Sequence, residues 1–141
     1  MMERDTSVRT LRLRIVVSLC VLVPLGFLVK YADPTASRWM NHHLAGLLYE
    51  IFWCLVFFFI FPRARTTTVA VSVFIVTSLL EFLQLWSVPF LDSIRHTWLG
   101  GVLLGNTFSV VDFLFYAAGC LLACYYMEWL RNRRHFKRLR S

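Results

Sequence analysis

Two polar residues lie three positions apart inside a long apolar run, in the stretch SLLEFLQLW at residues 78–86. Residues three apart share a face of a helix, so Glu81 and Gln84 would give one polar face to an otherwise apolar helix. Ionisable residues in membrane-spanning helices usually face a bundle interior or a wet cavity. We therefore interpret this face as part of a polar site. The structural alternative is an interhelical hydrogen bond that only fixes helix packing.

Other polar residues fall at a similar depth in their predicted helices. At ~1.5 Å of rise per residue, Glu81 lies ~7–8 Å and Asp112 ~4–5 Å from the same predicted membrane surface. The predicted site residues are Glu81, Gln84, Asp92, Arg95 and Asp112. Four of them, Glu81, Gln84, Arg95 and Asp112, would meet at the level of Glu50 just below the outer surface, where a polar pocket would open outward. Catalytic residues are not assigned.

Each of these residues also has a structural explanation. Asp112 follows Ser109 by three positions, which is the spacing of a capping box at a helix start. Asp92 can cap a short helix after Pro89, and Arg95 can simply neutralise Glu81 or Asp112. Glu50 lies near the predicted membrane interface and is left out of the site.

Two further residue types could bind a metal ion, but the sequence does not favour one. His42 and His43 are predicted to be solvated loop residues. Cys120 and Cys124 are one helical turn apart, without the additional ligands that would complete a metal set. Buried cysteines usually behave as small apolar residues. We expect free thiols, no metal and no cofactor.

Composition indicates how these residues are positioned. Apolar residues make up 58% of the 141-residue chain and charged residues 16%, against about 25% charged in a typical soluble domain. Residues 44–61 read LAGLLYEIFWCLVFFFIF, with one charge in eighteen positions. A bilayer span requires ~20 mostly apolar residues. These features exclude a soluble domain.

The predicted fold is an all-α integral membrane protein with a single domain over residues 1–141. Four transmembrane helices are expected at about residues 12–32, 44–61, 67–86 and 109–130. Pro24 would kink the first. Residues 91–108 are predicted to form a short re-entrant or interfacial helix, because their uncharged part is too short to cross. Residues 131–141 form a basic cytoplasmic tail.

The distribution of charge predicts the orientation. With the N-terminus in the cytoplasm, twelve of the fifteen Lys and Arg residues lie on the inner side, and only Lys30, Arg38 and Arg95 lie outside. This split follows the positive-inside rule and favours four spans with both termini cytoplasmic. A fifth crossing by residues 91–108 would place one basic end outside. The net charge of +7 therefore indicates contact with anionic lipid head groups rather than nucleic acid.

The pattern EFLQLWSVPFLDSIRHTWLGGVLLGNTFSVVDFLFYAAG, preceded by LLYEIFWCLVFFFIFPRAR, resembles a bacterial membrane-protein family called domain of unknown function 2809. The resemblance covers about residues 40–120. The motif positions are Glu81, Gln84, Pro89, Asp92, Arg95, Gly100, Gly105, Asp112, Tyr116 and Gly119. The family is distantly similar to VanZ-like proteins, which are named from glycopeptide-antibiotic resistance. The resemblance implies a small integral protein of the bacterial inner (plasma) membrane and supplies no reaction.

Three functions remain open at this point. The first is a binding protein whose pocket holds a cell-envelope or lipid-linked ligand, with Arg95 on its phosphate or carboxylate. The second is a structural or assembly subunit in which the polar cluster only locks the helices together. The third is a membrane enzyme that uses Glu81 or Asp112 as a general acid or base. Membrane lipid is the expected partner in each case, and the number of copies in the assembly is left open.

Overall fold

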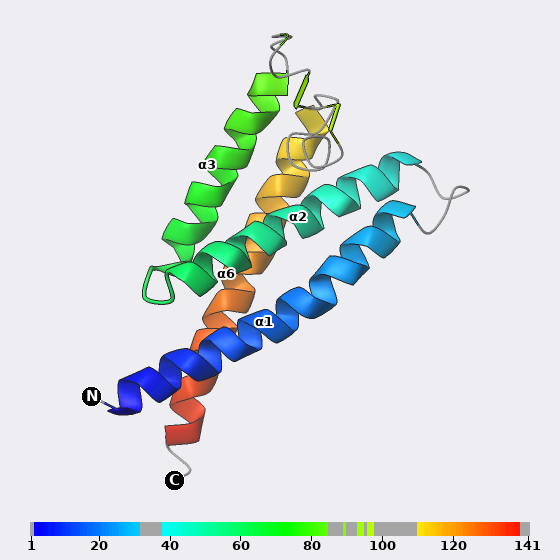
Figure 1. The fold of residues 1–141 in the computed structure, drawn as a ribbon. Coiled ribbons are helices and arrows are strands. Elements are labelled where there is room, and N and C mark those ends of the chain that lie inside the picture. The colour runs from blue at the N-terminus through cyan, green and yellow to red at the C-terminus, as the bar shows by residue number, and fades with distance from the viewer. Residues whose placement is uncertain are drawn as a thin grey trace.

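The computed structural model describes residues 2–31, 38–84 and 110–138, with single positions at 89, 93, 94, 96 and 97. These ranges form four long helices and contain no strand (Figure 1). The helices are α1 (Met2–Tyr31), α2 (Arg38–Ile60), α3 (Thr66–Gln84) and α6 (Val110–Arg138). The all-helical prediction is confirmed. The predicted re-entrant helix at 91–108 lies almost entirely outside the described residues.

All four helices are long and apolar enough to cross a bilayer, which confirms the predicted number of candidate spans. Their apolar parts run over Val8–Lys30, Asn41–Ile60, Thr66–Leu83 and Val110–Asn132. α1 continues through Pro24 as one helix. α2 includes His42 and His43, which the sequence placed in a loop. Polar residues at the start of a span look like a loop in a hydropathy profile, but here a side-chain partner on α6 accommodates one of them.

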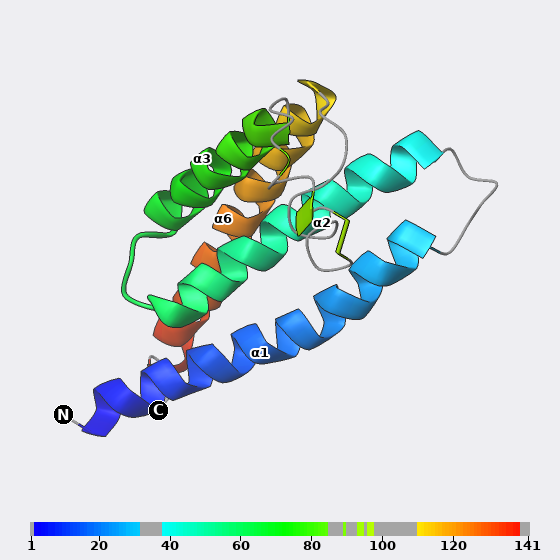
Figure 2. The ribbon, with the colours of Figure 1, turned by 45° about the horizontal axis from the view of Figure 1, so that its top comes forward.

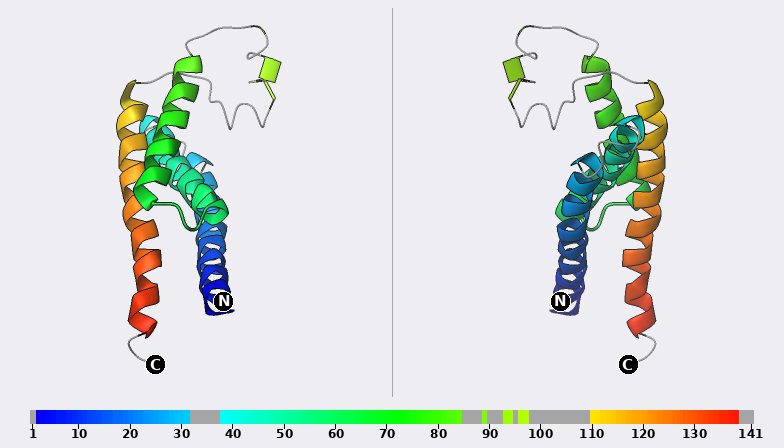
Figure 3. Two further views of the ribbon diagram at one scale, coloured as in Figure 1. Left: turned by 90° about the vertical axis from the view of Figure 1, so that its left-hand side faces the viewer. Right: turned by 90° about the vertical axis from the view of Figure 1, so that its right-hand side faces the viewer.

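The helices run alternately up and down along the bundle for α1, α2 and α3 (Figures 1 and 2). α6 runs in the same direction as α2, and these two helices share the most extensive contact. α1 packs mainly on α2, and α3 packs on α6 and α2. The first turns of α1, the last turns of α6 and the turn at residues 61–65 lie toward one end of the bundle, which we call the basic end, and α1 and α6 extend beyond that turn (Figure 3). The opposite end, where α2 and α6 begin, is called the polar end.

The apolar core lies between the helices toward the basic end. Leu11, Ile15, Phe58, Ala123 and Met127 are almost completely buried there. Large apolar side chains point outward on every helix, including Val21, Leu79, Leu114 and Leu121. An exposed apolar surface that surrounds all four helices is the surface expected for contact with lipid.

Two arginines connect helices toward the basic end by donating hydrogen bonds to backbone carbonyls. Arg12 Nε donates to Phe59 O at 3.3 Å, and Arg131 Nη2 donates to Ala64 O at 2.5 Å. Phe59 belongs to the last turn of α2, where carbonyl groups lack partners within the helix. Cations also interact favourably with the negative end of the helix dipole. These contacts tie α1 and α6 to the end of α2.

Candidate functional site

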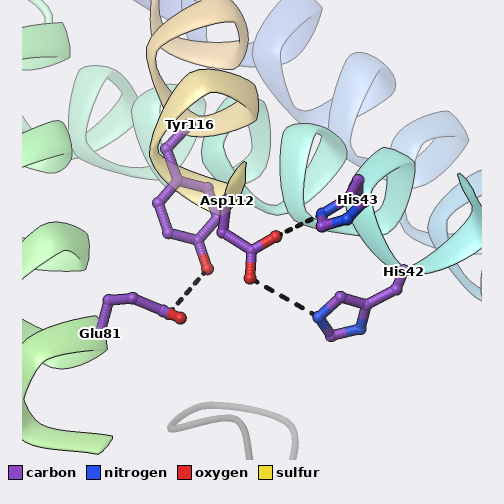
Figure 4. Close-up of polar contacts among 5 residues, drawn as sticks. All are labelled: His42, His43, Glu81, Asp112 and Tyr116. Atoms are coloured by element: carbon purple, nitrogen blue, oxygen red, sulfur yellow. Dashed lines mark hydrogen bonds and ion pairs between the residues drawn. The ribbon is translucent and has the colours of Figure 1, made fainter. Parts of the chain in front are cut away.

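A buried carboxylate at the polar end lies between two histidines. Asp112 is in the first turn of α6, and His42 and His43 are in the first part of α2. His43 Nδ1 and Asp112 Oδ1 are hydrogen-bonded at 2.5 Å, and both side chains are buried. The other oxygen, Oδ2, lies 3.6 Å from His42 Nε2, whose side chain is 57% exposed (Figure 4). One oxygen of the carboxylate is thus fixed inside, and the other faces a side chain that reaches the surface.

The local structure favours a negative charge at this position. Asp112 lies at the N-terminus of α6, where unpaired backbone N–H groups and the helix dipole stabilise an anion. The imidazole of His43 also stacks on the Phe115 ring, with 4.9 Å between centroids and 12° between planes. This stacking fixes the ring so that Nδ1 faces the carboxylate. The second nitrogen points away from Asp112.

A second acid reaches the same region from α3. Tyr116 donates from its hydroxyl group to Glu81 Oε2 at 3.1 Å, and Glu81 is only 2% exposed. Tyr116 follows Asp112 by four residues, so both lie on one face of α6. Figure 4 shows the tyrosine hydroxyl between the two carboxyl groups. Glu81, Asp112 and Glu50 are all close enough for their charges to act on the Tyr116 hydroxyl.

The third acid lies one turn deeper in the bundle. Glu50 on α2 is completely buried, and Cys120 Sγ donates to its Oε2 at 3.3 Å. Its other oxygen, Oε1, has no hydrogen-bond partner within the described part of the chain. Cys54 Sγ is 4.0 Å from Cys120 Sγ, which is about twice the length of a disulfide bond (~2.05 Å). Both cysteines are free thiols.

α6 is the helix that connects these groups. Asp112, Tyr116 and Cys120 recur every four residues along one face, and they contact α2, α3 and α2 in turn. Two turns further on, Glu128 accepts a hydrogen bond from Thr66 on α3 at 2.5 Å. The polar face of α6 therefore extends from the polar end almost to the basic end.

Small residues allow α2 and α6 to approach closely at this site. A Cβ atom on Gly119 would lie 2.7 Å from Leu47 O and 2.8 Å from Glu50 Cβ. A Cβ atom on Gly46 would lie 3.2 Å from the Tyr116 ring. Helix pairs in membranes use glycine in this way, because it lets the two backbones come together. The glycine at 119 thus determines how near Glu50 lies to the polar face of α6.

The structure describes two of the predicted site residues in full and brings them into one region. Glu81 and Asp112 are both buried and are connected through Tyr116, although no direct bond joins them. Gln84 is the last residue of α3, and its side chain lies outside the described residues. Asp92 and Arg95 also lie outside the described residues, so their predicted roles stay predictions.

The prediction that His43 is a solvated loop residue was wrong. It is 2% exposed and hydrogen-bonded on α2. Glu50, which the sequence left outside the site, is completely buried beside Cys120. The spacing of residues in the sequence could have predicted that both side chains face the bundle, since positions 43, 46, 50 and 54 share one face of a helix. Starting the second span at residue 44 concealed that pattern.

The described cluster consists mainly of hydrogen-bond acceptors and imidazoles. It could receive hydroxyl, amino or other donor groups, or a cation, close to Asp112 and Glu81. Among the described residues no group of three or more His, Cys, Asp or Glu side chains is arranged to hold a metal ion.

Apolar helices of spanning length around a buried acid–histidine cluster define a multi-pass membrane protein. Residues 35–120 match the family described as "Protein of unknown function (DUF2809)", and this chain belongs to that family. The match includes α2, α3 and the first turns of α6, and thus the whole described cluster. Neither a curated protein nor a solved structure gives a significant match to the chain.

Proposed function

We propose that this chain is a binding protein of the bacterial plasma membrane. Its ligand would be a cell-envelope or lipid-linked molecule whose polar group is held at the polar end. The observation that carries this proposal is that the two carboxylate oxygens of Asp112 have different environments. One carboxylate oxygen is fixed by buried His43, while the other faces the largely exposed His42. A carboxylate held in this way is preorganised and still within reach of a ligand.

The chemistry of the cluster defines the ligand group. Asp112 and Glu81 accept hydrogen bonds, so they would bind hydroxyl or amino groups such as those of a sugar or an amine. Gln84 is the last residue of α3, and Asp92 follows it in the chain. Arg95 would add a contact to a phosphate or carboxylate group. A sugar or amine linked to phosphate would use both kinds of contact.

The charge distribution supports an outward-facing site. The basic segments at both chain ends and the turn with Arg63 and Arg65 gather at the basic end of the bundle (Figure 1). The positive-inside rule would place that end in the cytoplasm. The polar end would then face outward, where envelope precursors are handled.

A structural function is the second candidate, and a specific observation favours it. Three polar groups on α6 pair with a side chain of a neighbouring helix: Asp112 with α2, Tyr116 with α3, and Glu128 with α3. Interhelical hydrogen bonds of this kind stabilise membrane helix pairs by ~0.6 kcal/mol on average, up to ~1.7. Such a ladder could serve only to lock the bundle.

Shape-conserving substitutions separate these two candidates. Asp112→Asn and Glu81→Gln keep an acceptor oxygen and side-chain size but remove the charge. Each variant would be expressed in cells lacking the native protein, with membrane protein level and sensitivity to an envelope-directed antibiotic measured separately. A binding site predicts lost function at an unchanged protein level. Thr67→Val, at an exposed position of α3, is the control.

The structural function predicts a different relation between the two measurements. Function would follow the amount of folded protein, so that Tyr116→Phe and Glu81→Gln would reduce both together. Full function of Asp112→Asn and Glu81→Gln at normal protein level would overturn the binding proposal.

A further inference from the structure

A separate apolar groove runs between α1, α2 and α6, away from the acid–histidine cluster. Its volume is about 330 Å³, at the low end of the range of roughly 300–1,000 Å³ typical of ligand pockets. Its lining is almost entirely apolar and includes Val21, Leu22 and Leu25 of α1, Ile51 and Leu55 of α2, and Tyr126 of α6. Its size suits part of an extended hydrocarbon chain. α1 contacts α6 only slightly, which leaves this groove open.

The face of α1 that lines the groove changes from charged to polar to apolar along the helix. Arg14, Ser18, Leu22 and Leu25 follow one another at spacings of four, four and three residues, so they share a face. Arg14 lies near the level where α2 ends, because Arg12, half a turn away, binds Phe59 O. The charged end of this face is therefore level with the end of α2, and the apolar end lies deeper along the bundle.

Two hydroxyl groups lie where the lining of the groove changes from polar to apolar. Ser18 Oγ and the Tyr126 hydroxyl oxygen are 2.7 Å apart, and this hydrogen bond joins α1 to α6. Ser18 follows Arg14 by four residues, which corresponds to ~6 Å along the helix. The interfacial layer of a bilayer, between hydrocarbon and water, is roughly 5–8 Å thick. A phospholipid with its phosphate beside Arg14 would therefore have its ester groups at about the depth of Ser18.

An aromatic pair at the same level is consistent with a membrane interface. Tyr126 stacks on Trp129, with 5.6 Å between ring centroids and 23° between planes, and Trp129 is partly exposed. Tyrosine and tryptophan are enriched at membrane interfaces, because their rings are apolar and their edges are polar. The groove thus has a surface level, an interfacial level and a hydrocarbon level in the order that a phospholipid requires.

We propose that this groove binds one anionic phospholipid, with its phosphate beside Arg14 and one acyl chain along Leu22 and Leu25. Charge complementarity determines the class of lipid. Arg14 is a half-buried cation, and a long arginine side chain can extend to the phosphate level while its stem stays in hydrocarbon. A zwitterionic lipid would gain less, because its own cation lies beside the phosphate. This inference is independent of the function proposed for the polar end.

The test uses the full-length chain in detergent, titrated with phosphatidylglycerol or phosphatidylcholine and examined by native mass spectrometry. One phosphatidylglycerol should bind in preference to phosphatidylcholine. Arg14→Gln should weaken phosphatidylglycerol binding roughly fivefold, from about 1 kcal/mol for each basic residue near an anionic surface. Arg9→Gln is the matched control, because Arg9 is exposed on the same helix and lies off the groove face.

A groove-filling substitution tests the acyl chain separately. Leu22→Trp should weaken binding of both lipids by filling the hydrocarbon part of the groove. Leu25→Trp, at a more exposed position of the same groove, replaces it if Leu22→Trp lowers the yield of folded protein. Unfolding temperature in detergent verifies the fold of each variant.

Four results would overturn the proposal. Equal binding of the two lipids would indicate ordinary annular lipid. An equal loss from Arg9→Gln and Arg14→Gln would indicate diffuse charge attraction. Undiminished lipid binding to the folded tryptophan variant would show that the acyl chain of the lipid lies outside this groove. A doubled mass that carries no lipid and is lost in the tryptophan variant would show that a second copy occupies the face.

Discussion

His43 Nδ1 and Asp112 Oδ1 lie 2.5 Å apart across the contact between α2 and α6, and both side chains are buried. This contact joins the first turns of two helices that run in the same direction from the polar end. It brings a carboxylate to a helix N-terminus, where the dipole favours it, and holds it with a charge-assisted hydrogen bond. The rest of the cluster is arranged around this pair.

The His43–Asp112 contact should be the main source of stability at the polar end. Asp112→Leu removes the acceptor and should lower the free energy of unfolding by ~1–3 kcal/mol, the cost of leaving a buried polar group without its partner. His42→Gln, at the exposed neighbour, should change it by less than ~0.5 kcal/mol. Denaturant unfolding in detergent measures both. Equal losses would show that burial of His43 is not what stabilises this end.

The close approach of α2 and α6 depends on Gly119. In Gly119→Ala the added Cβ would meet Leu47 O at 2.7 Å, and overpacking of this kind typically costs ~1–3 kcal/mol. Gly26→Ala on α1 is the matched control, because nothing lies within 4 Å of the added atom. That change should be neutral or should stabilise the helix by ~0.5–1 kcal/mol. Unfolding temperatures that fall equally in both would contradict this assignment.

Tyr116 and Glu81 should be energetically coupled across α6 and α3. A double-mutant cycle with Tyr116→Phe and Glu81→Gln should give a coupling free energy of ~0.5–1.5 kcal/mol, as expected for one buried hydrogen bond. The pairing of Tyr116→Phe with Thr66→Val should be additive, because Thr66 lies at the other end of α3. Additive effects in the first cycle would mean that the hydroxyl does not bind Glu81.

Of the three consecutive threonines at the start of α3, only Thr66 should matter for stability. Thr66 is 1% exposed and donates to Glu128 Oε1, whereas Thr67 and Thr68 are exposed. Thr66→Val should cost ~1–3 kcal/mol, since it leaves a carboxylate short of a donor. Thr67→Val should stay within ~0.5 kcal/mol. Thermal unfolding of the two variants, side by side, decides between them.

The topology predicts that both chain ends are cytoplasmic. Single cysteines placed at Thr6 and Ser141 should be protected from a membrane-impermeant thiol reagent in intact cells and become reactive when the membrane is permeabilised. The native cysteines are all within apolar helix segments, so a variant without them gives the cleanest background. Reaction of either introduced cysteine in intact cells would reverse the orientation or change the number of crossings.

The sequence alone determined the architecture, because hydropathy is a local property. Apolar runs of spanning length require helices in a bilayer, and Lys and Arg at their ends predict which ends lie together. The family was also accessible from the sequence, and the match to it covers residues 35–120. Glu81 and Asp112 were recognised for a local reason as well, because a charge within an apolar helix requires a partner.

The pairing of the polar residues depended on the tertiary structure. No pattern in the sequence indicates that Asp112 faces His43, or that Tyr116 is the residue that links Glu81 to α6. Both pairings depend on the rotation of each helix about its axis and on the close contact that Gly119 permits. Those quantities are set by packing between segments far apart in the chain. His43 and Asp112 are 69 residues apart, and Glu81 and Tyr116 are 35 residues apart. The same applies to Glu50. The sequence places it on a predicted helix, but its burial beside Cys120 depends on the close approach of α6.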